Sequence, residues 1–124
     1  MNSTPEFTIE LALDEIDYLA SPDAVLKARL SIRNSTTDPE TLTFGTGQMY
    51  DLEICDDHGS MVYLWSKGKV FPQVATTVQV QYEKDFDLTA PLAQVRPGKY
   101  VAKAWFLLPG PPRAYSASAR FNVI

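Results

Sequence analysis

The side chains best suited to chemistry lie together in one short stretch, Cys55–Gly59 (CDDHG), which holds the only cysteine and the only histidine of the chain. A histidine beside carboxylates could act as a general base, and the same groups could bind a metal ion. A catalytic triad needs a histidine held between a nucleophile and an orienting carboxylate, whereas His58 lies in an expected turn between two strand patterns. Three adjacent residues cannot all converge on one ion, and no second histidine or cysteine completes a zinc site. The stretch therefore indicates a hairpin turn, with Gly59 supplying the positive φ, and neither a catalytic nor a metal site.

The cysteine also bears on reactivity and location. Cys55 falls on the outward face of its strand pattern beside Glu53, and a negative neighbour raises the pKa of a thiol, so a reactive nucleophile is not expected. A single cysteine cannot form an internal disulfide, which fits a reducing compartment. The start of the chain, MNSTPEFTIE, shows no signal-peptide pattern, and the apolar run AWFLL is too short to cross a bilayer. We therefore expect a cytoplasmic protein without a membrane partner.

A glycine-rich stretch, Gly45-Thr46-Gly47-Gln48, invites comparison with a phosphate-binding loop. Such a loop leads from a strand into a helix N-terminus and usually carries a lysine. Here a strand pattern follows, and no lysine is near. The glycines are therefore expected to turn a corner between two sheets, with Gln48 and Asp51 hydrogen-bonded to loop backbone.

The charge of the chain argues against nucleic-acid binding. The net charge is -4 and the 11 basic residues are scattered, so the clustered lysines and arginines of a nucleic-acid site are missing from the sequence. The acidic run Asp14, Glu15, Asp17 and Asp23 could bind calcium through carboxylate oxygens. It lacks the spacing of an EF-hand loop, and a solvated loop is the simpler interpretation. No other metal and no cofactor is expected.

The elements that position these residues show two-residue alternation, which is typical of strands with one face on a core and one in water. The alternating segments are 7–13, 24–34, 41–44, 49–55, 76–83 and 115–123. Two more, 60–66 and 100–108, are apolar on both faces, as in central strands or in strands whose outer face is covered by a loop or a partner. The 9 prolines and the turn residues between segments argue against long helices. The pattern predicts one all-β domain, residues 1–124: an antiparallel β-sandwich of seven to eight strands, with a closed barrel as the alternative.

One long motif is more specific than these patterns. Its elements are Phe44-Gly45-Thr46-Gly47-Gln48, Tyr50-Asp51-Leu52, Gly59, Trp65-Ser66, Gly68, Phe71-Pro72-Gln73 and Pro97-Gly98-Lys99-Tyr100. From Leu26 to Leu107 the chain resembles the BsuPI family, the intracellular proteinase inhibitors of bacilli and related domains. It departs from the family pattern at Thr46, where serine is expected, and at Tyr63 and Leu64, where tryptophan and arginine are expected.

The resemblance implies an immunoglobulin-like β-sandwich that inhibits an intracellular subtilisin-type serine protease. It implies no catalysis by the domain itself. The motif residues to which we assign a structural role are Gly47, Gln48, Tyr50, Asp51, Gly59, Trp65, Pro97, Gly98 and Tyr100.

Two segments could contact such a protease. In Leu107–Tyr115 (LLPGPPRAY), three prolines favour an extended, pre-organised backbone suited to a substrate cleft, although a stiff connector between strands would show the same pattern. In Ser66–Gln73 (SKGKVFPQ), inside the motif, an aromatic residue lies between polar ones. The candidate contact residues are Leu108, Pro109, Pro111, Pro112 and Arg113 in the first segment, and Ser66, Lys69, Phe71 and Gln73 in the second. The aromatics Tyr63, Trp65, Phe71 and Trp105 fit either a core or an apolar surface that receives a partner.

The leading hypothesis is a cytoplasmic binding protein that occludes the cleft of a subtilisin-like protease. A loop, or a β-edge added to the protease's substrate strand, would fill the cleft, with anchors such as Leu108, Phe71 or Arg113. The alternative is an immunoglobulin-like structural or adhesion module that binds another protein or a glycan. An enzyme is disfavoured because the sequence holds no coherent acid–base set.

Overall fold

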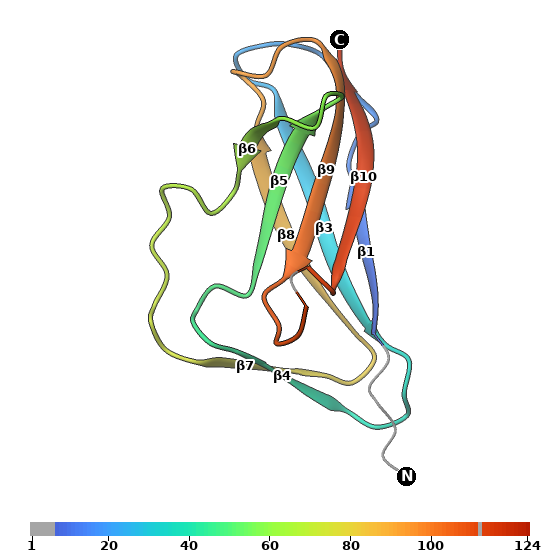
Figure 1. Cartoon of the computed structure of the whole chain (residues 1–124). Helices are drawn as coiled ribbons and strands as arrows, with labels where there is room; N and C mark the ends of the chain where they lie inside the picture. The colour runs from blue at the N-terminus through green and yellow to red at the C-terminus, as the bar shows by residue number, and fades with distance from the viewer. Residues whose placement is uncertain (1–6, 112) are drawn as a thin grey trace.

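The residues that the computed structural model describes, 7–111 and 113–124, form ten strands in three sheets (Figure 1). The sheet of order β1-β3-β8 contains β1 (Phe7–Leu13), β3 (Val25–Asn34) and β8 (Glu83–Pro91). The sheet of order β2-β10-β9-β5-β6 contains β2 (Asp17–Tyr18), β10 (Ser116–Val123), β9 (Gly98–Phe106), β5 (Tyr50–Asp56) and β6 (Met61–Leu64). The third sheet pairs β4 (Glu40–Phe44) with β7 (Thr76–Val80).

The predicted class, an all-β sandwich, is confirmed, and the described residues contain ten strands where the sequence predicts seven or eight. The pairings are antiparallel, apart from the short parallel contact between β2 and β10. The sheets stay separate, so the barrel alternative is wrong. In the described part of the chain, no helix is long and apolar enough to cross a membrane.

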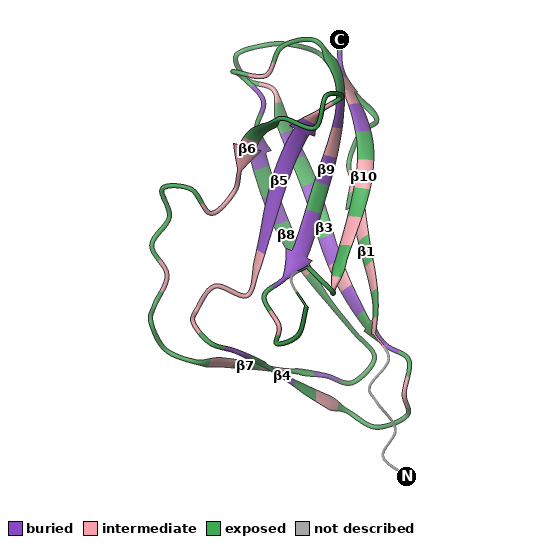
Figure 2. Ribbon diagram, viewed as in Figure 1, coloured by how far each residue is buried: buried purple, intermediate pink, exposed green. Residues whose placement is uncertain are grey.

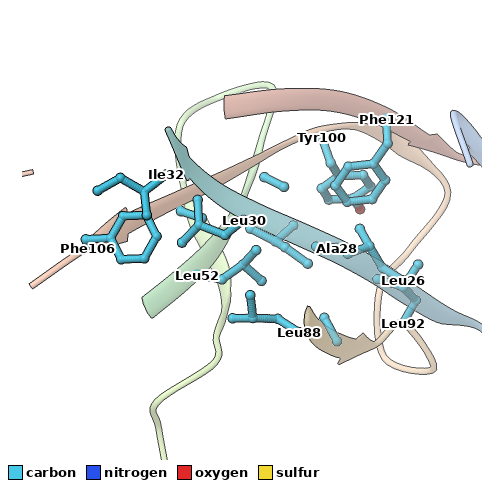
Figure 3. Close-up of a cluster of buried hydrophobic side chains, with 14 of the residues drawn as sticks. Leu26, Ala28, Leu30, Ile32, Leu52, Leu88, Leu92, Tyr100, Phe106 and Phe121 are labelled. Atoms are coloured by element: carbon cyan, nitrogen blue, oxygen red, sulfur yellow. The ribbon is translucent and has the colours of Figure 1, made fainter. Parts of the chain in front are cut away.

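The core lies between the two larger sheets. In β3, Leu26, Leu30 and Ile32 are fully buried, whereas Lys27 and Arg29 between them are exposed. Leu52 of β5 is fully buried as well, and it projects into the same cluster as Leu30 (Figure 3). Removing one such side chain from water stabilises the fold by about 1.5–3 kcal/mol. This burial holds the sheets face to face, as the alternation predicts.

The two segments that are apolar on both faces lie in different places. Residues 100–108 lie mostly in β9, which is central because it pairs with both β10 and β5. Residues 60–66 contain β6, which forms an edge of the same sheet, so the central-strand interpretation is wrong for this segment. Met61 and Val62 of this edge are exposed.

The outer face of β5 is covered, and that of β9 is covered at Trp105, whereas Lys103 on the same face of β9 is exposed. Trp105 of β9 is buried on this face, beneath the guanidinium of Arg113. The neighbouring side chains of β5, Asp51, Glu53 and Cys55, are buried too, where the alternation predicts a face in water (Figure 2). The reason is tertiary: segments far along the chain fold back over this face and replace the solvent.

One strand, β8, is absent from the predicted set. Its residues Phe86, Leu88 and Ala90 alternate with charged or polar neighbours, so the signal is present but is masked by the acidic residues around it. The predicted strand 76–83 ends earlier, at Val80. Tyr82, which the pattern places on the inner face, is 73% exposed because the chain turns a corner there.

Asn34 holds that corner, where the β3–β8 ladder gives way to the β4–β7 ladder (Figure 1). Its buried side-chain amide donates hydrogen bonds to the backbone carbonyls of Asp38 at 2.8 Å and Val80 at 3.1 Å. Its carbonyl oxygen accepts the backbone N–H of Thr36 at 2.9 Å. Its own backbone N–H donates to Tyr82 at 2.8 Å. One side chain therefore satisfies the backbone groups that the bend leaves without a strand partner.

Replacing Asn34 by alanine should lower the free energy of unfolding by about 2–3 kcal/mol, because buried carbonyl and N–H groups lose their partners. Urea denaturation monitored by tryptophan fluorescence measures this change. Asn122→Ala is the matched control, since Asn122 donates one exposed hydrogen bond to Asp17 and should cost under about 1 kcal/mol. Equal effects of the two substitutions would contradict the role given to Asn34.

Candidate functional site

The carboxyl group of Asp51 joins three segments on the outer side of β5. Asp51 is 6% exposed. One oxygen accepts the backbone N–H of Leu52 at 2.8 Å and that of Ser66 at 3.0 Å. The other accepts the hydroxyl of Ser66 and the side-chain amide of Gln48, the latter at 3.3 Å. The loop between β4 and β5, residues 45–49, is here named the corner loop. The motif residues Gln48, Asp51 and Ser66 thus fix the start of the β6–β7 connection against this loop.

The corner loop holds the far end of the same connection. The backbone N–H of Gly47 donates to the carbonyl of Pro72 at 2.8 Å. A Cβ atom at position 47 would lie 2.7 Å from Cδ of Pro72 and 3.2 Å from its carbonyl oxygen. Glycine is required here by close backbone approach and not by a phosphate ligand.

An aromatic column supports the connection between these two points. Ring centroids lie 5.8 Å apart for Phe71 and Trp65, 5.3 Å for Trp65 and Tyr50, and 5.2 Å for Tyr50 and Phe86. Phe86 in turn lies 5.6 Å from Phe106 in the core. These separations fall in the range of favourable aromatic pairs, each worth about 0.5–1.5 kcal/mol beyond its burial. Through these ring contacts, the surface segment Ser66–Gln73 is packed onto the core of the sandwich.

The candidate contact residues of Ser66–Gln73 differ in what they offer to a partner. Ser66 is occupied by Asp51, and Phe71 packs on Trp65. The ammonium of Lys69 lies 4.4 Å from the centroid of the Trp65 ring, and the exposed Gln73 donates to the carbonyl of Phe71 at 3.3 Å. The residue that projects freely is Val70, at 96% exposure, which is missing from the predicted site.

The second candidate segment, Leu107–Tyr115, folds back on the sheet. Arg113 donates two hydrogen bonds to the carboxylate of Glu53, at 2.7 and 3.2 Å. Its guanidinium also lies 4.0 Å from the centroid of Trp105. The backbone of Arg113 has φ 57°, a left-handed conformation that a non-glycine residue adopts at a cost. The contacts with Glu53 and Trp105 offset that cost. Through them, Arg113 attaches this loop to β5 and β9.

The other residues of this segment are divided between core and solvent. Leu108 is half-buried and packs against the core. Pro109 and Pro111 are exposed, and Pro112 lies outside the described residues. The backbone N–H of Leu107 donates to Met49 at 2.9 Å, so the corner loop lies between the two candidate segments.

The turn at Asp56–Ser60 exposes His58 to solvent, beside the carboxylate of Asp57 but away from any nucleophile among the described residues. The carboxylate of Asp56 accepts the backbone N–H groups of His58 at 3.0 Å and Ser60 at 2.9 Å. Gly59 has φ 82°, the positive value that the turn pattern predicts. The His58 side chain is 85% exposed and reaches Asp57 at 3.6 Å. Among the described residues this arrangement contains no nucleophile–base pair.

The thiol of Cys55 is not activated as a nucleophile, because it is buried beside a negative charge. Burial, followed by the negative charge of Glu53, raises the pKa of its thiol. The buried, protonated thiol is a poor nucleophile near neutral pH.

In the acidic run at residues 14–23, the carboxylates of Asp14 and Asp17 accept internal hydrogen bonds. Asp14 accepts the hydroxyl of Tyr18 at 2.6 Å and the backbone N–H of Lys27 at 3.0 Å, and Asp17 accepts the side-chain amide of Asn122 at 2.9 Å. Burial opposes ionisation of Asp14, but these hydrogen bonds outweigh it and lower the pKa of its carboxyl group. Within the described ranges, no group of three acidic, histidine or cysteine side chains is placed to hold a metal ion. The calcium alternative therefore has no support from the geometry.

The motif Pro97–Tyr100 lies at the start of β9, at the end of the sandwich opposite to the corner loop. Tyr100 donates its hydroxyl to the carbonyl of Arg96, and its ring stacks on Phe121 with centroids 5.6 Å apart. Burial raises the pKa of the Tyr100 hydroxyl, which keeps it protonated as a donor. Gly98 begins β9, and Pro97 is exposed beside it.

Comparison with known families now decides the identity. A family model described as BsuPI, intracellular proteinase inhibitor, matches residues 15–110. The chain belongs to the BsuPI family. The match contains the whole of Ser66–Gln73 in this BsuPI chain, whereas it ends at Gly110, inside the Leu107–Tyr115 loop. No curated protein matches the chain.

Solved structures share the BsuPI fold at low sequence identity. A CARDB domain from Pyrococcus furiosus, solved in complex with di-metal ions, has TM-score 0.54 and 12% identity, covering 100% of this chain and 95% of that one. Spo0M, a sporulation control protein from Bacillus subtilis, has TM-score 0.57 and 11% identity, covering 95% and 48%. A β-glucosidase from Listeria innocua in complex with isofagomine has TM-score 0.57 and 12% identity, covering 98% of this chain but only 16% of the enzyme. The immunoglobulin-like class of the sandwich is thereby confirmed, and at these identities the likeness shows the fold alone.

Replacing Gly47 by alanine should displace Pro72 and lower the free energy of unfolding by about 1–3 kcal/mol, because a proline ring and its backbone cannot move aside freely. Gly45→Ala is the matched control two residues away, since a Cβ there has no atom within 4 Å. Thermal or urea unfolding of the two variants measures the difference. The account of Gly47 is wrong if both variants are as stable as the parent.

Proposed function

We propose that this BsuPI chain is a non-catalytic cytoplasmic protein that inhibits an intracellular subtilisin-type serine protease by occupying its active-site cleft. Residues 1–124 would form one inhibitor domain. The family supports a protease as the partner. The observation that carries the proposal is the stretch Lys69–Pro72 of the β6–β7 connection, which lies outside the sandwich between two hydrogen-bonded ends (Figure 2).

Pre-organisation is what a cleft-binding segment needs. A flexible loop loses about 0.5–1.5 kcal/mol for each rotamer-rich side chain that is ordered on binding. Here Asp51 and the corner loop fix the backbone before any encounter, and Trp65 holds the flanking side chains. Most of the ordering cost is therefore met by folding of the sandwich, and main-chain hydrogen bonds to the protease can contribute more fully to affinity.

Of the two candidate segments, the geometry favours Ser66–Gln73 as the main contact. In the Leu107–Tyr115 loop, Leu108 packs against the core and Arg113 binds Glu53, so two of its proposed anchors have internal partners. In Ser66–Gln73, Phe71 packs on Trp65, but the neighbouring Val70 is left fully available to a partner. This loop better fits the role of a connector that covers Trp105. The exposed edge of β6, with Met61 and Val62, lies directly before Ser66 and could extend the contact by adding a strand to the protease.

Titration of a purified intracellular subtilisin with the full chain tests the function. We expect half-maximal inhibition at or below about 1 μM, equivalent to a binding free energy of about -8 kcal/mol. A metalloprotease in the same assay should be unaffected. An absence of inhibition at micromolar excess over the serine protease would sink the proposal.

Two loop replacements of the folded chain locate the contact. A Gly-Ser linker of equal length in place of Pro109–Arg113 should leave the inhibition constant within about threefold. It should lower stability by about 1–2 kcal/mol, because Glu53 loses a charged hydrogen-bond partner. The same linker in place of Lys69–Pro72 should abolish inhibition while the sandwich stays folded by circular dichroism. The opposite result would move the contact to the Leu107–Tyr115 loop.

The second candidate is an immunoglobulin-like structural or adhesion module that binds another protein or a glycan. It is favoured by the occurrence of this fold as a small part of a β-glucosidase, of which the chain covers 16%. Affinity capture from cytosol, with and without a covalent serine-protease inactivator, separates the candidates. Loss of the captured protein after inactivation supports the inhibitor, and capture that is unchanged supports the module.

A further inference from the structure

We infer that Val70 is the side chain that enters the primary specificity pocket of the target protease, and that this pocket is apolar and sized for a small β-branched residue. The inference rests on the proposed function. It identifies one residue as the determinant of specificity and states the chemistry of the pocket that would receive it.

Trp65 engages the side chains on both sides of Val70. Lys69 lies over the ring, with its ammonium 4.4 Å from the centroid, and Phe71 packs beside it at 5.8 Å. The two neighbours of Val70 therefore both turn toward Trp65, whereas the Val70 side chain is 96% exposed and is directed away from the domain.

Val70 is 96% exposed, and the next most exposed large apolar residue in the described part of the chain, Leu19, is 74% exposed. Isolated apolar residues on a surface need no special explanation. Val70 differs in its degree of exposure and in its two neighbouring side chains, which both engage Trp65.

Hydrogen bonds anchor the backbone on both sides of Val70. On one side, the N–H of Lys69 donates to Ser66 at 3.0 Å, and Gly68 takes φ 81° in the intervening turn. On the other side, the carbonyl of Pro72 accepts the N–H of Gly47 at 2.8 Å. The three-residue stretch Lys69–Phe71 is thus suspended between two hydrogen-bonded points, and the stiff χ1 of valine leaves its side chain few rotamers to lose on binding.

The chemistry of the pocket follows from Val70 itself. An aliphatic side chain gains free energy only in a pocket that excludes water. A charge at position 70 would enter such a pocket without a partner and would be rejected. Removing two methyl groups should instead weaken binding moderately, since about one methylene changes discrimination by roughly 10–200-fold.

The test measures inhibition constants of four full-length chains against a purified intracellular subtilisin: the parent, Val70→Ala, Val70→Asp and Ile16→Asp. Ile16 is the matched control because it is 71% exposed and lies outside the β6–β7 connection. We expect Val70→Ala to weaken inhibition by at least ~10-fold, and Val70→Asp to weaken it further, by at least ~100-fold. Ile16→Asp should stay within about threefold of the parent.

The possible failures are distinguishable. If the parent does not inhibit, the proposed function fails and takes this inference with it. If the parent inhibits but Val70→Asp is equally potent, the inference about Val70 is wrong while the function stands. Unfolding midpoints serve as the folding check, and they should be unchanged because the Val70 side chain is exposed.

Discussion

A carboxyl group removed from water must find hydrogen-bond partners within the protein. The path of the β6–β7 connection over the outer face of β5 depends on the partners of the Asp51 carboxyl group. Its partners come from the corner loop, from β5 itself and from the residues that follow β6. The outer face of β5 would otherwise be an ordinary solvated face. With Asp51 buried there, the chain after β6 must return to cover it, and that return defines where the β6–β7 connection begins.

The connection that results is long, and its order needs a physical cause. Fixing the backbone of one residue costs about 1–2 kcal/mol, so an unsupported segment between Leu64 and Thr76 would stay mobile. The support comes from both sides: Asp51 and Gly47 hold the backbone, and the column of Phe71, Trp65 and Tyr50 joins it to the core. The same contacts that stabilise the fold therefore present Lys69–Pro72 in one conformation. In a protein of an inhibitor family, this is the property that a cleft-binding segment requires.

Much of the sandwich is predictable from the sequence, because alternation is a local signal. The first strand is predicted residue for residue at Phe7–Leu13, and the expected strands at 24–34 and 115–123 differ from β3 and β10 by one residue. The position of Gly47 in the loop between β4 and β5, and the hydrogen bond of 3.2 Å from the Gln48 side-chain amide to the backbone carbonyl of Tyr50, agree with similar local reasoning. The alternation signal fails where tertiary contacts decide: it cannot show that Glu53 is covered by a residue 60 positions along the chain. The same holds for Val70, whose exposure depends on a tryptophan that engages the residues on both sides.

Rigidity of the exposed segment is the central claim, and backbone ¹⁵N relaxation of the free protein tests it most directly. Order parameters of the amides of Lys69, Val70 and Phe71 should be near those of the strands, about 0.85, because both ends of the stretch are anchored. The amides of Gln94 and Arg96, in the loop between β8 and β9, provide a comparison within the same spectrum. Values below about 0.6 at Lys69–Phe71 would show a flexible loop and would contradict the account.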